Sequence, residues 1–223
     1  MIQVKICGMM TQSDIALCAD AGADALGFVT EYPQDVPWNL SAQQAAALMQ
    51  CVPKSITKFM VTGGSPDKVV SLATYAMPDV VQLHSNETVE EITEIAQRLS
   101  ALGIRTVKAL RIDEQDNLLF EHKHISAAVR ALEKTGIIAI LLDSATQSSP
   151  GGTGRTVNLD IYKEILETAT IPIILAGGLQ AENLADILDT GRHPYMLDVL
   201  TGVETTPGTK DAKKVAAFIH AAK

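Results

Sequence analysis

The residues IIAILLD at positions 137–143 form an unbroken apolar run that ends in a carboxylate. A run that is apolar on both faces is typical of a parallel strand buried on two sides. Seven more short apolar runs recur at intervals of roughly 20 to 35 residues. The eight predicted strands are Ile2–Ile6, Ala25–Val29, Ile56–Val61, Val80–Leu83, Thr106–Leu110, Ile137–Leu142, Ile171–Leu175 and Met196–Val199. Eight is the number of strands that closes a (β/α)8 barrel.

Helix-like stretches separate these runs, and several carry start and stop signals. Thr11 or Ser13 is placed to cap the first helix, Ser41 to cap the second, and Pro66 stands in a first helical turn. The first predicted helix ends near Ala21. The other predicted helices cover Ala42–Met49, Lys68–Tyr75, Thr88–Leu102, Ile125–Lys134, Leu159–Thr168, Ala181–Asp189 and Lys210–Ala222.

The alternation continues without a Ser/Gly-rich or charged linker, so we expect one domain over residues 1–223. A doubly wound open sheet would show the same alternation. Eight units, with Gly-rich turns concentrated after the late strands, favour a single-domain (β/α)8 (TIM) barrel. Active sites of such barrels lie at the carboxyl ends of the strands.

The composition argues against several kinds of partner and site. The chain carries a formal net charge of −8 and no cluster of Lys and Arg, so we expect neither nucleic acid nor membrane as a partner. Cys7, Cys18 and Cys51 form no CxxC pair, which argues against a zinc site and a disulfide framework. With no signal-peptide pattern and no run of 18 apolar residues, a cytoplasmic protein without a bound metal is expected.

Glycine-rich turns follow the last three predicted strands. Backbone N–H groups converge on an anion at such turns, and barrels often bind phosphate with the loops after strands seven and eight. A tight strand-to-helix turn is the alternative for any single glycine pair, but three consecutive turns favour a phosphate site. The predicted phosphate-binding residues are Gly152, Thr153, Gly154, Gly177, Gly178, Thr201 and Gly202, with Arg155 either beside them or on the surface.

Two residues at strand ends are candidates for acid–base chemistry. Cys7 follows the first strand, where it is either a small buried hydrophobe or a thiol at the barrel mouth that can become a thiolate. Asp143 ends the sixth strand, where it is either a turn residue or a carboxyl group facing the mouth. We favour the catalytic reading of Asp143, whereas position alone leaves Cys7 open.

Two more strand-end residues are candidates for holding a ligand. Asp198, within the eighth strand, is suited to orient a substrate hydroxyl or amine. Gln82 and His84 flank Leu83 and therefore share one face of the fourth strand, so His84 is a candidate ligand contact, although a lone histidine is usually structural.

Several motifs, in order along the chain, resemble those of the phosphoribosylanthranilate isomerase family. They are VKICG at 4–8, GADALGFV at 22–29, VQLH at 81–84, LLD at 141–143, GGTGRT at 151–156, AGGL at 176–179, DVLTGVE at 198–204 and PGTKD at 207–211. They span all but one or two of the eight units, and the KICG start combined with the late loops is highly specific.

The resemblance implies the isomerase of tryptophan biosynthesis, a branch of aromatic amino-acid biosynthesis. Its reaction is the Amadori rearrangement of N-(5-phosphoribosyl)anthranilate to 1-(2-carboxyphenylamino)-1-deoxyribulose 5-phosphate. It implies Cys7 as general base, Asp143 as general acid and no redox or metal cofactor. The expected partner is the phosphorylated sugar substrate, with other tryptophan-pathway enzymes as further candidates. The residue types suit the chemistry, because ring opening needs a proton and C2 must lose one.

One loop departs from the family pattern. The family carries an arginine, associated with the anthranilate carboxylate, shortly before the next helix, whereas Thr30–Leu40 contains neither Arg nor Lys and appears about two residues longer. Either another cation, for which Arg111 is our candidate, binds the carboxylate, or the aromatic part of the substrate differs. Trp38 in this loop is placed to stack on an aryl ring or to pack within the loop.

Two other functions stay open on the sequence alone. A related barrel isomerase or epimerase that acts on a different phosphosugar would explain the missing arginine. A non-catalytic phosphosugar-binding relative would not need both Cys7 and Asp143, which argues against it.

Overall fold

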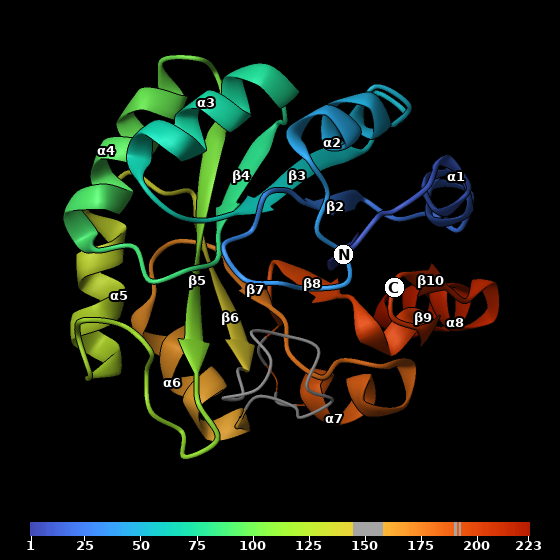
Figure 1. Ribbon diagram of the computed structural model, residues 1–223. Coiled ribbons are helices and arrows are strands. Elements are labelled where there is room, and N and C mark those ends of the chain that lie inside the picture. Colours follow the sequence, from blue (N-terminus) through green and yellow to red (C-terminus); the bar gives the residue numbers. More distant parts are fainter. Residues whose placement is uncertain (145–157, 190, 192) are drawn as a thin grey trace.

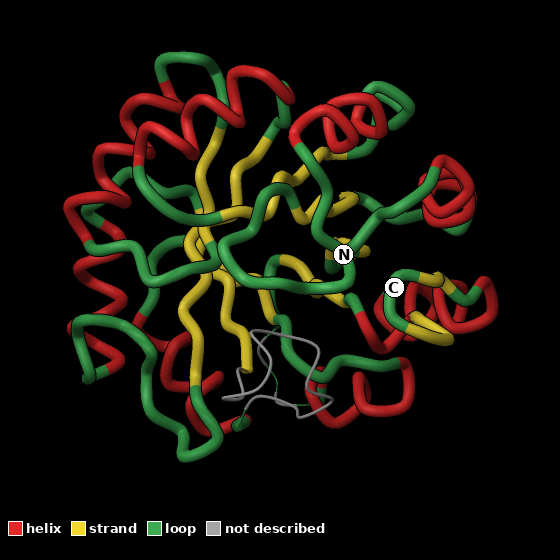
Figure 2. Tube along the Cα trace, in the orientation of Figure 1, coloured by secondary structure: helices red, strands yellow, loops and turns green. Residues whose placement is uncertain are grey.

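The computed structural model describes residues 1–144, 158–189, 191 and 193–223. Eight parallel strands form a closed barrel in chain order, with helices around it (Figures 1 and 2). The strands are β1 (Gln3–Ile6), β2 (Ala25–Val29), β3 (Thr57–Thr62), β4 (Val80–Leu83), β5 (Arg105–Ile112), β6 (Ala139–Ser144), β7 (Ile173–Leu175) and β8 (Met196–Val199). Pairing of β1 with β8 closes the barrel, which confirms the predicted fold and excludes the open sheet.

The helices follow the predicted positions closely. Thr11, Ser41 and Thr88 each accept a hydrogen bond from the third helical N–H, so Thr11 rather than Ser13 caps the first helix. The helices are α1 (Gln12–Asp20), α2 (Ala42–Met49), α3 (Pro66–Ala76), α4 (Val89–Ser100), α5 (Ile125–Glu133), α6 (Leu159–Thr168), α7 (Leu184–Leu188) and α8 (Ala212–Ala222), with short 3₁₀ helices η1 (Ala181–Asn183) and η2 (Thr201–Val203). No helix of the described residues is long and apolar enough to cross a membrane.

Two apolar clusters stabilise the barrel. The larger one packs the outer faces of the strands against the helices. The smaller one fills the interior of the barrel, and its members are Ala25, Phe59, Val80, Val107, Ala109, Ala139, Leu141, Ile174, Ala176 and Met196. Because successive strand residues point to opposite faces, the last inward-facing residue of each strand reaches the mouth of the barrel. Arg111 and Asp143, which are register partners on β5 and β6, extend the inward rows that contain Ala109 and Leu141.

The C-terminal region differs from the prediction. Residues after β8 form an unpredicted hairpin of β9 (Glu204–Thr206) and β10 (Thr209–Lys210). Lys210 was predicted to begin the last helix, but its ammonium lies 2.7 Å from the buried Glu204 carboxylate, which holds it in the hairpin. The helix α8 begins two residues later, where Asp211 accepts hydrogen bonds from the N–H groups of Lys213 and Lys214. The predicted helix Ala181–Asp189 is divided into η1 and α7.

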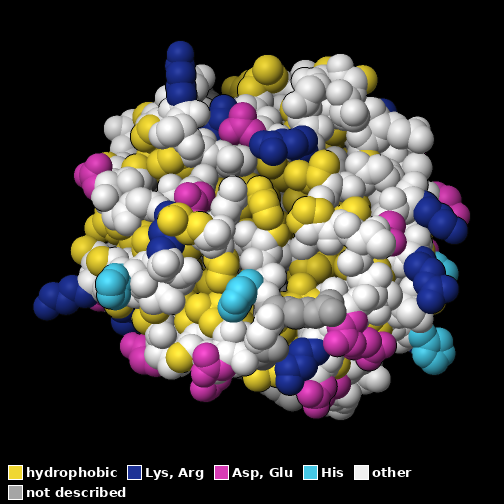
Figure 3. All heavy atoms as spheres, turned by 180° about the vertical axis from the view of Figure 1, so that it is seen from behind, with side chains coloured by type: hydrophobic (Ala, Val, Ile, Leu, Met, Phe, Trp, Pro, Cys, Tyr) yellow, Lys and Arg dark blue, Asp and Glu magenta, His cyan; other side chains and the backbone are white. Residues whose placement is uncertain are grey.

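The surface seen from behind has an apolar centre. In Figure 3, hydrophobic side chains gather near the middle of this face, and most charged side chains lie towards its edge.

Candidate active site

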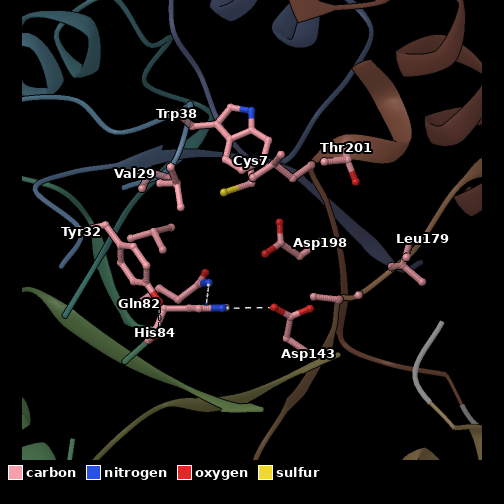
Figure 4. Close-up of a pocket in the computed structure, with 16 residues that line it drawn as sticks. Cys7, Val29, Tyr32, Trp38, Gln82, His84, Asp143, Leu179, Asp198 and Thr201 are labelled. Carbon is pink, nitrogen blue, oxygen red and sulfur yellow. Dashed lines mark hydrogen bonds and ion pairs between the residues drawn. The ribbon is translucent and has the colours of Figure 1, made fainter. Parts of the chain in front are cut away.

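A cavity lies among the residues at the carboxyl ends of the barrel strands (Figure 4). Its empty volume, which includes space open to solvent, is about 690 Å³. It is lined by Cys7, Val29, Tyr32, Val36, Trp38, Val61, Gln82, His84, Asp143, Ala176, Gly177, Gly178, Leu179, Asp198, Leu200 and Thr201. Residues as far apart in the sequence as Cys7 and Thr201 therefore line the same cavity.

Cys7 directly follows β1, and its sulfur faces the cavity in Figure 4. The residue is 5% exposed. Burial raises the pKa of the thiol, attraction from the Lys5 ammonium opposes that rise, and repulsion from Asp198 adds to it. Gly27 on β2 leaves space for both groups, because a Cβ there would lie 2.6 Å from Cys7 Sγ and 3.1 Å from Lys5 Cε. The thiol is thus packed beside a buried cation.

Lys5 is fully buried inside the barrel and pairs with Asp198. Its Nζ lies 2.7 Å from Asp198 Oδ2. Burial alone would lower the pKa of Lys5, but attraction from Asp198 and Cys7 outweighs burial and the pKa is raised, so Lys5 carries a charge. The second oxygen, Asp198 Oδ1, is buried without a hydrogen-bond partner in the described part of the chain. Because an unpaired buried acceptor costs about 1–3 kcal/mol, this oxygen is suited to receive a donor from a ligand.

Asp143 and His84 face each other across the cavity floor. His84 Nε2 lies 3.1 Å from Asp143 Oδ2, and Gln82 Nε2 lies 3.1 Å from His84 Nδ1. With the Gln82 amide nitrogen donating to Nδ1, the ring proton resides on Nε2 and points to Asp143. The Tyr32 hydroxyl donates to the His84 backbone oxygen at 2.7 Å, which fixes the histidine further. Gln82 and His84 share one face, as the strand alternation predicted.

The opposite side of the cavity is made by the loops after β7 and β8. Gly177 and Gly178 have φ of +83° and +63°, a left-handed conformation that glycine adopts readily, and both line the cavity together with Thr201. Gly202 does not line it, but a Cβ there would lie 1.9 Å from the backbone oxygen of Leu179, so the glycine lets the two loops pack together. The predicted residues Gly152, Thr153, Gly154 and Arg155 lie outside the described residues.

The substitution Gly202→Ala is expected to weaken phosphate binding. The added Cβ must push the loop carrying Thr201 away from Leu179, and hydrogen bonds to a charged ligand are worth enough that losing one costs about 10- to 100-fold in affinity. The inhibition constant of inorganic phosphate measures this directly. Gly103→Ala is the control, because Gly103 lies after α4, does not line the cavity and would place its Cβ in open space. Equal phosphate affinity in both variants would contradict this role of Gly202.

The loop Thr30–Leu40 lines the remaining side with apolar and aromatic groups. Tyr32, Val36 and Trp38 contribute to the wall, whereas Glu31 and Asp35 are exposed. The Glu31 carboxylate accepts a hydrogen bond from the N–H of Ala42 at 3.2 Å and so turns to the start of α2. The acidic residues of this loop therefore do not oppose an anionic ligand inside the cavity.

Arg111 lies beside the site but does not line the cavity. It is 6% exposed and its guanidinium donates to the Asn86 side chain, while its Nε has no partner among the described residues. Its pairing with a substrate carboxylate stays a prediction.

Lys5 and Tyr32 make polar contacts at the site that the sequence analysis did not predict. The alternation of side chains along a strand could have indicated Lys5, because it lies two residues before Cys7 and therefore points to the same side of β1. Tyr32 had no such signal, because its position depends on the path of the loop. In the part of the chain that is described, no group of three or more His, Cys, Asp or Glu side chains could hold a metal.

Comparison with known proteins points to one family. Residues 4–221 match the family model described as N-(5'phosphoribosyl)anthranilate (PRA) isomerase. The N-(5'-phosphoribosyl)anthranilate isomerase of Methanosarcina acetivorans is 36% identical over 220 residues, which cover 98% of this chain and 92% of the relative. The phosphoribosyl anthranilate isomerase structure from Thermotoga maritima has a TM-score of 0.80 at 31% identity and covers 100% of this chain and 98% of that one. A structure of this isomerase in complex with reduced 1-(o-carboxyphenylamino)-1-deoxyribulose 5-phosphate has a TM-score of 0.77 at 29% identity, with coverage of 100% and 98%.

Proposed function

The chain belongs to the N-(5'-phosphoribosyl)anthranilate isomerase family and is an isomerase of tryptophan biosynthesis, and we propose that Cys7 and Asp143 carry out its reaction. The reaction is the Amadori rearrangement of N-(5-phosphoribosyl)anthranilate to 1-(2-carboxyphenylamino)-1-deoxyribulose 5-phosphate. We propose further that residues 1–223 act as one cytoplasmic domain. The observation that carries the assignment of residues is the placement of Cys7 and Asp143 on one cavity wall, with Asp198 between them (Figure 4).

The first step is the opening of the ribose ring. Asp143, as the carboxylic acid, donates its proton to the ring oxygen while the bond between that oxygen and C1 breaks. The lone pair of the amine nitrogen forms the C1=N bond, which gives a protonated Schiff base. His84, whose Nε2 lies 3.1 Å from the Asp143 carboxylate, holds this carboxyl group in place by donating a hydrogen bond to it.

The second step is removal of the C2 proton. The positive nitrogen makes this proton acidic, and the Cys7 thiolate accepts it while the C2–H electrons form the C1=C2 bond and neutralise the nitrogen. The resulting enolamine passes its hydroxyl proton to the Asp143 carboxylate and takes up at C1 the proton held by Cys7, which gives the ketone and returns both groups to their starting states. No atom is gained or lost overall, as an isomerisation requires.

Two further groups position the substrate. The loops that contain Gly177, Gly178, Thr201 and Gly202 are proposed to hold the phosphate, with Gly152, Thr153 and Gly154 as the predicted third loop. Asp198 Oδ1 is proposed to accept a hydrogen bond from a sugar hydroxyl or the amine. Fixing the sugar between base and acid can contribute as much to rate as the proton transfers themselves.

Turnover of freshly prepared N-(5-phosphoribosyl)anthranilate tests this function. We expect its fluorescence to decay on addition of the protein, with the ketose as product. A stable signal at protein concentrations where inorganic phosphate still binds would indicate the second candidate function, a barrel isomerase with a changed substrate. The loop Thr30–Leu40 without Arg or Lys is the observation that favours that alternative.

Removing the Lys5 ammonium is expected to shift the pH dependence of the reaction. Lys5 opposes the rise in the Cys7 pKa, so in Lys5→Met this pKa rises further. A base must be deprotonated to act, and the increase of kcat/KM with pH therefore moves to higher pH. The increase with pH in the rate of Cys7 alkylation by iodoacetamide is likewise expected to move to higher pH in this variant.

Lys108→Met is the matched control for this shift. Lys108 is also buried and its Nζ pairs with Glu87 at 2.6 Å, but it is not in contact with Cys7. Breaking either buried pair leaves an unpaired carboxylate and costs about 3–5 kcal/mol of stability. If the pH profile of Lys108→Met shifted as far as that of Lys5→Met, the shift would reflect a general loss of stability and not the loss of a charge beside Cys7.

A further inference from the structure

We propose that this enzyme recognises the aryl group of its substrate through Trp38 and the apolar wall around it, and not through a cation that pairs with the ortho carboxylate. It then accepts N-aryl phosphoribosylamines in general, including those without the carboxylate. The inference rests on the proposed function, since it concerns the substrate range of the same site.

The layout of the cavity places the aryl group beside Trp38. In Figure 4, Thr201 and Leu179 lie at the right, and Cys7, Asp198 and Asp143 lie in the middle. Val29 and Tyr32 lie at the left, with Trp38 at the top, above Cys7. With the phosphate at the loops after β7 and β8 and the reacting carbons beside Cys7, the nitrogen substituent of the sugar extends to the third group. That group belongs to a buried cluster whose members are Cys7, Val29, Tyr32, Trp38 and Val61.

Trp38 presents its ring to the cavity because its one polar atom is bound elsewhere. The indole Nε1 donates to Glu204 at 3.0 Å, and the same carboxylate accepts from Lys210 Nζ at 2.7 Å. The neighbouring ring atom Cδ1 packs against Gly8, where a Cβ would lie 3.0 Å from it. The hairpin of β9 and β10 therefore holds Trp38 in place, and what remains for a ligand is its apolar surface, suited to ring stacking.

The described lining of the cavity gives a carboxylate no cationic partner, and Arg111, whose Nε has no partner among the described residues, lies outside that lining. Among the described residues that line the cavity there is no Lys or Arg. Lys5 is committed to Asp198, and Arg111 donates to Asn86. A carboxylate pressed against Val29 and Val61 would lose hydration with no compensating contact, which is costly. It is accommodated only where the cavity opens to water, and there it contributes little to binding.

The test compares two substrates that differ in this one group. N-(5-phosphoribosyl)anthranilate and N-(5-phosphoribosyl)aniline form from ribose 5-phosphate and the respective amine, and proton NMR follows the conversion of each to its ketose. We expect kcat/KM for the two to agree within about tenfold, whereas a site built on a charged hydrogen bond to the carboxylate would discriminate by about 10- to 100-fold or more.

Variants of Trp38 and Arg111 identify the recognising residue. Trp38→Ala is expected to raise KM for both aryl substrates by about tenfold or more, while the inhibition constant of ribose 5-phosphate, which has no ring, changes less than about threefold. Trp38→Phe, which keeps a ring but loses the bond to Glu204, is expected to preserve the ratio between the two substrates. Arg111→Met is likewise expected to preserve it.

The outcomes separate this inference from the function beneath it. Turnover of the anthranilate compound with aniline turnover more than about tenfold weaker would overturn the inference and leave the proposed function intact. Loss of the anthranilate preference in Arg111→Met would assign the carboxylate to Arg111 and also overturn it. Turnover of neither compound would overturn both.

Discussion

Replacing Cys7 with alanine is expected to lower kcat by about 10²- to 10⁴-fold, the range that one positioned acid–base group contributes. The methyl group of alanine cannot accept the C2 proton, and none of the described neighbours replaces the thiolate, because Lys5 is charged and Asp198 is committed to it. The fold should remain, since the change removes one sulfur from a wall that already opens to a cavity. Substrate binding, measured by KM or by phosphate inhibition, should change little.

The other two cysteines provide matched controls. Cys18 is fully buried in α1, and its burial raises its pKa to about 12, so it is an inert part of the core. Cys18→Ala is expected to cost about 1–2 kcal/mol of stability through lost packing, with full kcat. Cys51 is exposed, and Cys51→Ala should change neither the stability nor kcat. A Cys7→Ala enzyme with more than a tenth of the wild-type kcat would exclude this thiol as the base.

The barrel itself was predictable because its strands are marked by composition. Ala25–Val29 was predicted with its observed bounds, since a strand buried on both faces is apolar throughout. Capping residues located the helix starts, as at Ser41 before α2. Most of the site was predictable because active sites of these barrels lie at the carboxyl ends of the strands, and residues that directly follow a buried strand lie at the mouth of the barrel.

The pairs that hold the site were not predictable from sequence. Lys5 and Asp198 are 193 residues apart, and only closure of β1 on β8 makes them neighbours. Trp38 and Glu204 are 166 residues apart, and their hydrogen bond depends on the unpredicted hairpin of β9 and β10. Sequence periodicity describes one element at a time, whereas these contacts are set by how two distant elements meet.

The direction of side chains in the loop Thr30–Leu40 was equally out of reach. The sequence does not tell whether Glu31 points into the cavity; in the structure it turns away to the first turn of α2, and its backbone has a positive φ of 41°. A residue in an irregular loop has no periodicity that assigns it a face. The absence of Arg and Lys from this loop is visible in the sequence, but only the structure shows which of its side chains line the cavity.

The substitution Asp143→Asn is expected to reduce kcat about 10²- to 10⁴-fold while KM changes little. Asparagine has the same shape, and its oxygen can still accept a hydrogen bond from His84, so the cavity floor is preserved. Its amide has no carboxylic proton to give to the ring oxygen, which leaves the ribose closed. Steady-state kinetics with N-(5-phosphoribosyl)anthranilate, together with thermal unfolding to confirm the fold, measure both quantities.

Asp198→Asn is the informative contrast, because this carboxyl group lines the same cavity but is proposed to hold the substrate and not to protonate it. Its loss leaves the Lys5 ammonium buried without its partner, so stability and KM should suffer together. The double variant Cys7→Ala/Asp143→Asn should be little slower than either single one, since a stalled first step leaves nothing for the base to act on. If Asp143→Asn kept kcat and raised KM instead, Asp143 would be a binding residue, and the acid would have to be sought elsewhere.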